Sequence, residues 1–208
     1  MLSKTARRLI WVPIIHTSAD LGSVTESVKA LYARKVGLKK WDRHVASIDE
    51  LWRRIREKIS RLDLDYSKVK LYQDGLPNCG QELMIVKDMI KAGSLNHRLL
   101  LELMEKGARL VGTESPELLI EEYELVRGVL KRAKGARDAG EGRGLSREQA
   151  RRSMAILRKR DHYIAKRIDG TLERGETGLV FLGLLHRLQG LLPRDIRLSI
   201  LNPTDSDT

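Results

Sequence analysis

Five short apolar runs, separated by longer segments with helical periodicity, constrain the fold of this chain more than any other feature of its sequence. They are Leu9 to Ile15, Val69 to Gln73, Arg109 to Gly112, Leu179 to Gly183 and Ile196 to Leu201. Each run is too short for a stable helix and nearly continuous in apolar residues, which is typical of strands covered on both faces. Because parallel neighbours require long crossover connections, strands that alternate with helices favour a parallel sheet. We therefore predict a three-layer α/β sandwich with a mostly parallel central sheet of about five strands and helices on both faces.

The segments between the runs carry helix signals. In the stretch HVASIDELWRRIREKISRL, residues 44–62, apolar side chains recur every three or four positions, as along one buried face of a helix. Two further helices are expected to end at Gly93 and Gly107, because glycine readily adopts the left-handed conformation that terminates a helix. Others are expected to begin at Pro116, a residue favoured in the first turn, and after the N-cap Ser146.

The chain is predicted to form one domain over residues 1–208. Its 208 residues and 23.7 kDa are enough for one sizeable core, and no internal repeat is visible. Residues 135–144 hold four glycines and no apolar periodicity, so we predict a flexible loop there. Residues 202–208 are expected to form a disordered tail.

The sequence carries no signal for membrane insertion or export. No run approaches the roughly 20 apolar residues of a membrane helix, and the apolar stretch near the start lacks the small-residue cleavage site of a signal peptide. The single cysteine, Cys79, cannot form an internal disulfide, which agrees with a reducing compartment. We expect a cytoplasmic protein without a membrane segment. Cys79 closely follows the second predicted strand and could be a nucleophile, but we favour a buried and unreactive thiol.

The chain is basic, with 39 Lys and Arg against 28 Asp and Glu and a formal net charge of +11. Such a surface attracts polyanions, so nucleic acid is one partner to consider. The charge is dispersed, however, and its densest stretch, residues 146–167, is interleaved with apolar residues as on a solvated helix face. Aromatic residues make up 4% of the chain, which leaves few platforms for stacking bases. Nucleic acid binding is therefore not favoured.

Polar side chains with catalytic chemistry follow four of the five predicted strands. His16 follows the first run, Gln73 and Asp74 the second, Thr113 and Glu114 the third, and His186 the fourth. In parallel sheets ligands bind beyond the carboxyl ends of the strands, where the chain leaves the core. We therefore predict that the two histidines and the two acids converge as catalytic residues, with the glutamine and the threonine contributing to substrate binding.

An acidic residue interrupts the buried face of the longest predicted helix. Asp161 lies four residues after Leu157 and three before Ile164, on the apolar stripe. A buried carboxylate needs a partner, which either the neighbouring arginines 158 and 160 or another segment could supply. One interpretation is a structural ion pair that ties the helix to the strand ends. The other makes Arg160 and Asp161 part of the substrate pocket, with an arginine stabilising an anionic group of the substrate.

The segments RDHYIAKRID and GLVFLGLLHRLQGLL resemble the C-terminal signature of the TraB/Tiki and erythromycin-esterase/ChaN-like superfamily. The signature residues are matched by Arg160, Asp161, Ala165, Gly183 and His186, and the superfamily's early histidine by His16, with Asp74 and Glu114 as its further acids. In that superfamily an Arg-Asp or Arg-Asn pair opens a helix and a later strand ends in Gly-x-x-His. The resemblance implies an α/β fold with a polar pocket that serves, in different relatives, as a hydrolase, a metal-dependent peptidase, or a binder of haem or metal.

The first functional hypothesis is a hydrolase acting on a small molecule or a peptide. His16 or His186 would act as a general base on water, with an acid orienting the imidazole. Alternatively, the same group would hold a divalent ion, Zn²⁺ or Mn²⁺, with these two histidines among the ligands. No local metal motif such as HExxH is present, so the ligands would have to converge in space.

Two other hypotheses involve no catalysis. In one, the chain is a binding module whose basic surface holds an acidic partner or a nucleic acid. In the other, it is a degenerate member of the superfamily that acts in protein assembly or forms an oligomer. The segment LLHRLQGLL, residues 184–192, would then supply an exposed apolar contact.

Overall fold

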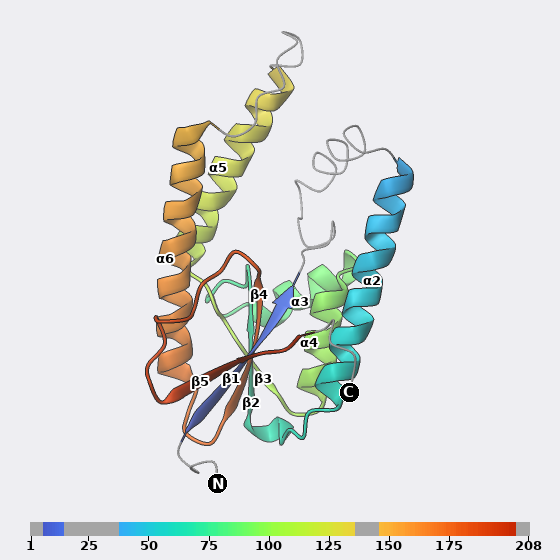
Figure 1. The fold of residues 1–208 in the computed structure, drawn as a ribbon, viewed down its shortest axis with the longest axis vertical. Coiled ribbons are helices and arrows are strands. Elements are labelled where there is room, and N and C mark those ends of the chain that lie inside the picture. The colour runs from blue at the N-terminus through green and yellow to red at the C-terminus, as the bar shows by residue number, and fades with distance from the viewer. Residues whose placement is uncertain (1–5, 15–37, 136–145, 203–208) are drawn as a thin grey trace.

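The computed structural model describes residues 6–14, 38–135 and 146–202, which form a five-stranded central sheet with helices on both faces (Figure 1). The strands are β1 (Arg7–Ile14), β2 (Val69–Gln73), β3 (Arg109–Val111), β4 (Thr177–Gly183) and β5 (Ile196–Ile200). Their order is β3-β2-β4-β1-β5, and every neighbouring pair is parallel. The predicted three-layer α/β fold is confirmed.

Most helices begin or end at the predicted positions, but the first described helix begins at Leu38, before the predicted stretch of residues 44–62. The helices are α2 (Leu38–Ser60), the short 3-10 helix η2 (Tyr66–Lys68), α3 (Glu82–Lys91), α4 (Leu95–Glu105), α5 (Pro116–Gly135) and α6 (Arg147–Thr171). Gly93 and Gly107 follow α3 and α4 with φ angles of 94° and 113°, and Ser146 forms the capping box at the start of α6. Gly135 belongs to α5, while the rest of the predicted loop and the predicted tail beyond Asn202 lie outside the described residues.

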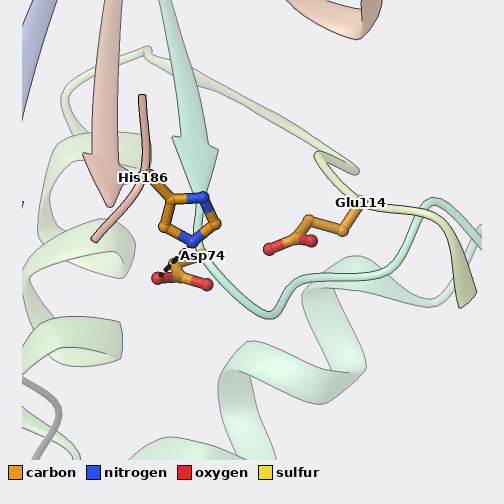
Figure 2. Close-up of side chains that lie close together, drawn as sticks. All are labelled: Asp74, Glu114 and His186. Carbon is orange, nitrogen blue, oxygen red and sulfur yellow. Dashed lines mark ion pairs between the residues drawn. The ribbon is translucent and has the colours of Figure 1, made fainter. Parts of the chain in front are cut away.

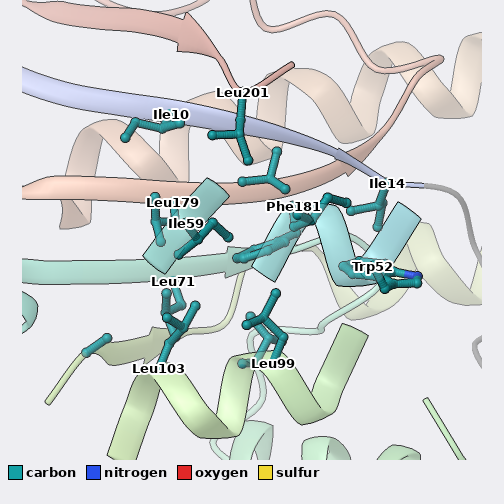
Figure 3. Close-up of a cluster of buried hydrophobic side chains, with 14 of the residues drawn as sticks. Ile10, Ile14, Trp52, Ile59, Leu71, Leu99, Leu103, Leu179, Phe181 and Leu201 are labelled. Atoms are coloured by element: carbon teal, nitrogen blue, oxygen red, sulfur yellow. The ribbon is translucent and has the colours of Figure 1, made fainter. Parts of the chain in front are cut away.

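The sheet separates two hydrophobic cores, because successive side chains of each strand point to opposite faces. In β4, Leu179 and Phe181 pack in the core formed with α2, α3 and α4, whereas Val180 and Leu182 pack in the core formed with α6. Figure 3 shows the first core, in which Phe181 lies among side chains of the sheet and of helices α2 and α4. Burial of each such side chain stabilises the fold by about 1.5–3 kcal/mol.

The connections that leave β2 and β4 run in opposite directions. From β2 the chain continues through α3 and α4 to β3, on the face of the first core. From β4 it continues through residues 184–195 to β5, and Leu188 of this segment packs in the second core. The carboxyl ends of β2 and β4, which are neighbours, therefore form a topological switch point, the place where open parallel sheets bind their ligands.

One helical arm extends beyond the carboxyl ends of the strands. It consists of α5 and the first half of α6, which lie side by side (Figure 1). Among the described residues, no helix is both long and apolar enough to span a bilayer.

The prediction that Cys79 is buried is wrong, because this residue is exposed. It lies in the loop that carries the chain from β2 to α3, where its backbone N–H donates to the Glu82 carboxylate over 2.8 Å. Such connecting loops run over the surface, since their backbone polar groups need partners or water.

Candidate functional site

A cluster of ionisable side chains lies at the switch point. It consists of Asp74 after β2, Glu114 after β3, Arg160 and Asp161 on α6, and His186 after β4; we call these five residues the edge cluster. Their exposed fractions are between 0% and 7%, so all five are buried. The backbone fixes two of them directly, because Asp74 N donates to Phe181 O over 2.8 Å and Glu114 N to Leu76 O over 3.0 Å.

His186 lies between two carboxylates. Its Nδ1 is 2.6 Å from Asp161 Oδ1 and its Nε2 is 3.2 Å from Asp74 Oδ2. Figure 2 shows the imidazole directed at Asp74, with Glu114 beside this pair. Burial by itself would lower the pKa of His186, but the hydrogen bonds to Asp161 and Asp74 outweigh it and raise the pKa to about 9. The imidazole is therefore protonated at neutral pH.

Arg160 joins the acidic residues into one network. Its Nε and Nη2 contact the two oxygens of Glu114 at 2.6 and 2.5 Å, and Nη2 also lies 2.6 Å from Asp74 Oδ1. Its Nη1 contacts Glu122 Oε2 of α5 at 2.5 Å. Burial raises the pKa of Glu114, and the guanidinium opposes this increase. Because its donors are directed at carboxylates, Arg160 positions the acids and neutralises their charge.

Backbone N–H groups donate further hydrogen bonds to the carboxylates. Asp74 Oδ2 accepts from Gly183 N over 3.0 Å, Glu114 Oε1 from Gly75 N over 2.8 Å, and Asp161 Oδ2 from Arg187 N over 3.2 Å. Hydrogen bonds of this kind favour the ionised form of an acid and restrict its rotation. These bonds hold the three carboxyl groups of the edge cluster in place.

A second buried arginine, at the amino-terminal end of β1, can be compared with the edge cluster. There Arg7 is buried and pairs with Asp169 and Asp195, but the side chains of these acids are 48% and 47% exposed. Such a pair attaches a helix and a loop to the sheet at little desolvation cost for the acids. In the edge cluster the three acids are buried as well, so their desolvation costs more and has to be offset by their ion pairs and hydrogen bonds.

Three residues of the edge cluster could hold a metal ion. Asp74, Glu114 and His186 each offer a ligand atom, and these atoms all lie within 4.8 Å of one another. An imidazole with two carboxylates suits borderline or hard ions such as Zn²⁺ and Mn²⁺. The predicted convergence of these three residues, from three separate strand ends, agrees with this geometry.

The other predicted site residues have different positions. His16 lies outside the described residues. Thr113 is fully buried, and its hydroxyl accepts from Gln73 N over 2.8 Å and donates to Val111 O, so it joins the end of β2 to the segment after β3. The side-chain amide of Gln73 donates to the backbone carbonyl of Asp74 over 3.1 Å. In the structure both residues act as supports for the strand ends.

Two features of the site could not be predicted from the sequence. The partner of Asp161 is His186, which belongs to another segment. Arg160, the neighbour of Asp161 on α6, donates to Glu114 instead. Glu122 was missed altogether, since nothing distinguishes it from the other acids of α5 in the sequence.

Comparisons with known proteins give no relative for this chain. No family model, no curated protein and no solved structure matches it.

Proposed function

We propose that this protein is a hydrolase that depends on a divalent metal ion bound by Asp74, Glu114 and His186. The observation that carries the proposal is the convergence of their three ligand atoms, within 4.8 Å, at the switch point of a parallel sheet. A bound Zn²⁺ or Mn²⁺ supplies Lewis-acid chemistry, because it polarises a carbonyl or phosphoryl group and lowers the pKa of water.

The position of Asp161 supports this assignment. Metal-ligating histidines usually donate their second ring N–H to a carboxylate, which fixes the tautomer and the ring orientation. Asp161, 2.6 Å from Nδ1 of His186, provides such a partner and leaves Nε2 directed at Asp74. We assign Asp161 as a positioning residue.

The charge of the edge cluster also favours a cation. With its three acids ionised, the edge cluster carries three negative charges against the two positive charges of Arg160 and the protonated His186, which leaves one net negative charge among buried groups. Exchange of the Nε2 proton for a divalent ion makes the five residues and the ion neutral. Since buried charge is expensive unless it is compensated, this exchange is electrostatically favourable.

The resemblance to the TraB/Tiki and erythromycin-esterase/ChaN-like superfamily agrees with this proposal. The matched Arg160, Asp161 and His186 are members of the edge cluster, and we propose that the chain is a remote member of that superfamily. We further propose His16, outside the described residues, as a second base or ligand. The single cysteine supports a cytoplasmic location, and the substrate class includes small molecules and peptides.

Metal binding by purified variants tests the proposal. We expect the wild-type protein, stripped with a chelator, to bind one Mn²⁺ or Zn²⁺ per chain in calorimetric titrations. His186→Ala should abolish this binding, and Asp161→Asn should weaken it by about 10–100-fold, the usual effect of removing a partner of a ligating histidine. His162→Ala changes an exposed histidine of α6, the helix that carries Asp161. This matched control should bind the metal ion normally. Absence of binding in the wild type, or normal binding in His186→Ala, would contradict the proposal.

A further inference from the structure

Several large apolar side chains are exposed in elements that lie at or beyond the carboxyl ends of the strands. Among the described residues, nine large apolar side chains are exposed: Leu83, Met84, Ile120, Tyr123, Val126, Met154, Leu184, Leu185 and Ile200. By sequence they belong to the start of α3, the helical arm, the segment after β4 and the end of β5. Single exposed apolar residues are normal, so neighbouring ones that lie beside a polar site are the more informative.

Leu184 and Leu185 are the most exposed of the nine, at 69% and 75%. They stand between Gly183 and His186, in the turn that delivers the histidine to the edge cluster. Leu188 of the same segment is fully buried, so this part of the chain does have access to a core. Leaving a leucine exposed forgoes most of the stabilisation that its burial would bring.

The turn that displays these leucines is fastened to the edge cluster. His186 N donates to Gly183 O over 3.2 Å and closes the turn, while Gly183 N donates to Asp74 Oδ2 over 3.0 Å. On the other side, Arg187 N donates to Asp161 Oδ2 over 3.2 Å. The two leucines are thus held in a fixed position relative to Asp74 and His186, as residues that position a ligand need to be.

We propose that Leu184 and Leu185 bind an apolar chain of the substrate, next to the polar group on which the edge cluster acts. This inference rests on the proposed function and defines its substrate as a molecule with an apolar chain beside a hydrolysable bond. Ligand sites combine mainly apolar walls with a few fixed polar groups. Here the edge cluster supplies the polar groups, and the two leucines supply apolar surface, with Ile120 exposed near the start of α5.

Two chelating probes that differ only in chain length test this inference. Acetohydroxamic acid and octanohydroxamic acid share a metal-binding head group, and the second adds six methylene groups. We expect the Mn²⁺-loaded wild-type protein to bind octanohydroxamic acid at least about tenfold more tightly, because part of the chain is buried. The double variant Leu184→Ser/Leu185→Ser should reduce this preference to less than about threefold, with unchanged affinity for acetohydroxamic acid and for Mn²⁺. Ile200→Ser, at an apolar residue of β5 that is 64% exposed, is the matched control and should keep the preference.

Three other outcomes would contradict the inference. Equal affinities of the wild type for the two hydroxamic acids would show that no chain is bound. If the double variant keeps the preference but loses self-association in sedimentation, or loses binding to phosphatidylserine vesicles, the leucines serve a second copy or a lipid surface instead. Failure of the wild type to bind Mn²⁺ would overturn the proposed function together with this inference, whereas Mn²⁺ binding without a chain-length preference would overturn this inference alone.

Discussion

At the scale of single residues, the protonation of His186 connects the edge cluster to the stability of the protein. In the metal-free protein its pKa is about 9, whereas an unfolded histidine titrates near pH 6.5. Because the folded pKa is the higher one, this contribution to stability is fully present below about pH 6.5 and is lost as the pH rises through 9. We expect the free energy of unfolding of chelator-treated protein, measured in urea, to fall by on the order of 2 kcal/mol over this interval.

Two variants separate His186 from the other titrating groups. His186→Gln removes the titration and should flatten the fall in the free energy of unfolding between neutral pH and pH 9. His162→Gln changes an exposed histidine and should keep the wild-type dependence. If the wild type has the same free energy of unfolding at about pH 6.5 and at pH 9, Asp74 and Asp161 do not stabilise the protonated form of His186.

The sequence predicted the members of the edge cluster better than their partners. Polar residues after buried strands pointed to Asp74, Glu114 and His186, because a parallel sheet brings all its carboxyl ends to one edge. The apolar stripe of α6 showed that Asp161 needs a partner. It could not show that this partner is His186 rather than Arg160, since the choice depends on where α6 crosses β4.

At the scale of elements, local patterns predicted the strands and helices because each signal depends on a few neighbouring residues. The runs around β2 and β4, the glycines after α3 and α4, and the capping box of α6 all correspond to observed bounds. The strand order β3-β2-β4-β1-β5 could not be predicted from the sequence, because any order of parallel strands is compatible with the same apolar runs. That order places β2 beside β4, and therefore Asp74 beside His186.

The loops after β2 and β3 are packed closely against each other at Gly112. A Cβ atom there would lie 2.6 Å from Asn78 Cα and 2.6 Å from Glu82 Oε1. We therefore expect Gly112→Ala to lower the free energy of unfolding by about 1–3 kcal/mol and to weaken Mn²⁺ binding, because the loops that carry Asp74 and Glu114 must move apart. Urea denaturation and calorimetry measure the two effects.

Gly170 provides the matched control for this substitution. It lies in α6, and a Cβ atom there would meet no atom within 4 Å. Gly170→Ala should raise the free energy of unfolding by about 0.5–1 kcal/mol, because alanine loses less conformational entropy in a helix. If both alanine variants stabilise the protein, the contact between the two loops is looser than the distances at Gly112 indicate.

At the scale of the whole molecule, the three proposed metal ligands come from segments that only the complete fold brings together. Asp74 depends on β2, Glu114 on β3, and His186 on β4, and these strands are joined through both faces of the sheet. The unfolded chain therefore lacks the site, and a metal ion that binds it stabilises only the folded state. Binding at one edge of the sheet is thus coupled to the unfolding of both cores.

This coupling predicts how Mn²⁺ changes unfolding. At a free concentration of about 100 times the Kd, one site raises the free energy of unfolding by about 2.7 kcal/mol. We expect the urea transition of the wild type to move to a higher denaturant concentration that corresponds to this increase in the free energy of unfolding, with far- and near-ultraviolet circular dichroism moving together. Glu114→Gln, compared with and without Mn²⁺, should lose the increase, while His162→Ala should keep it. A change confined to one spectral probe would mean that the ion stabilises a local segment, and an equal increase in Glu114→Gln would place the ion elsewhere.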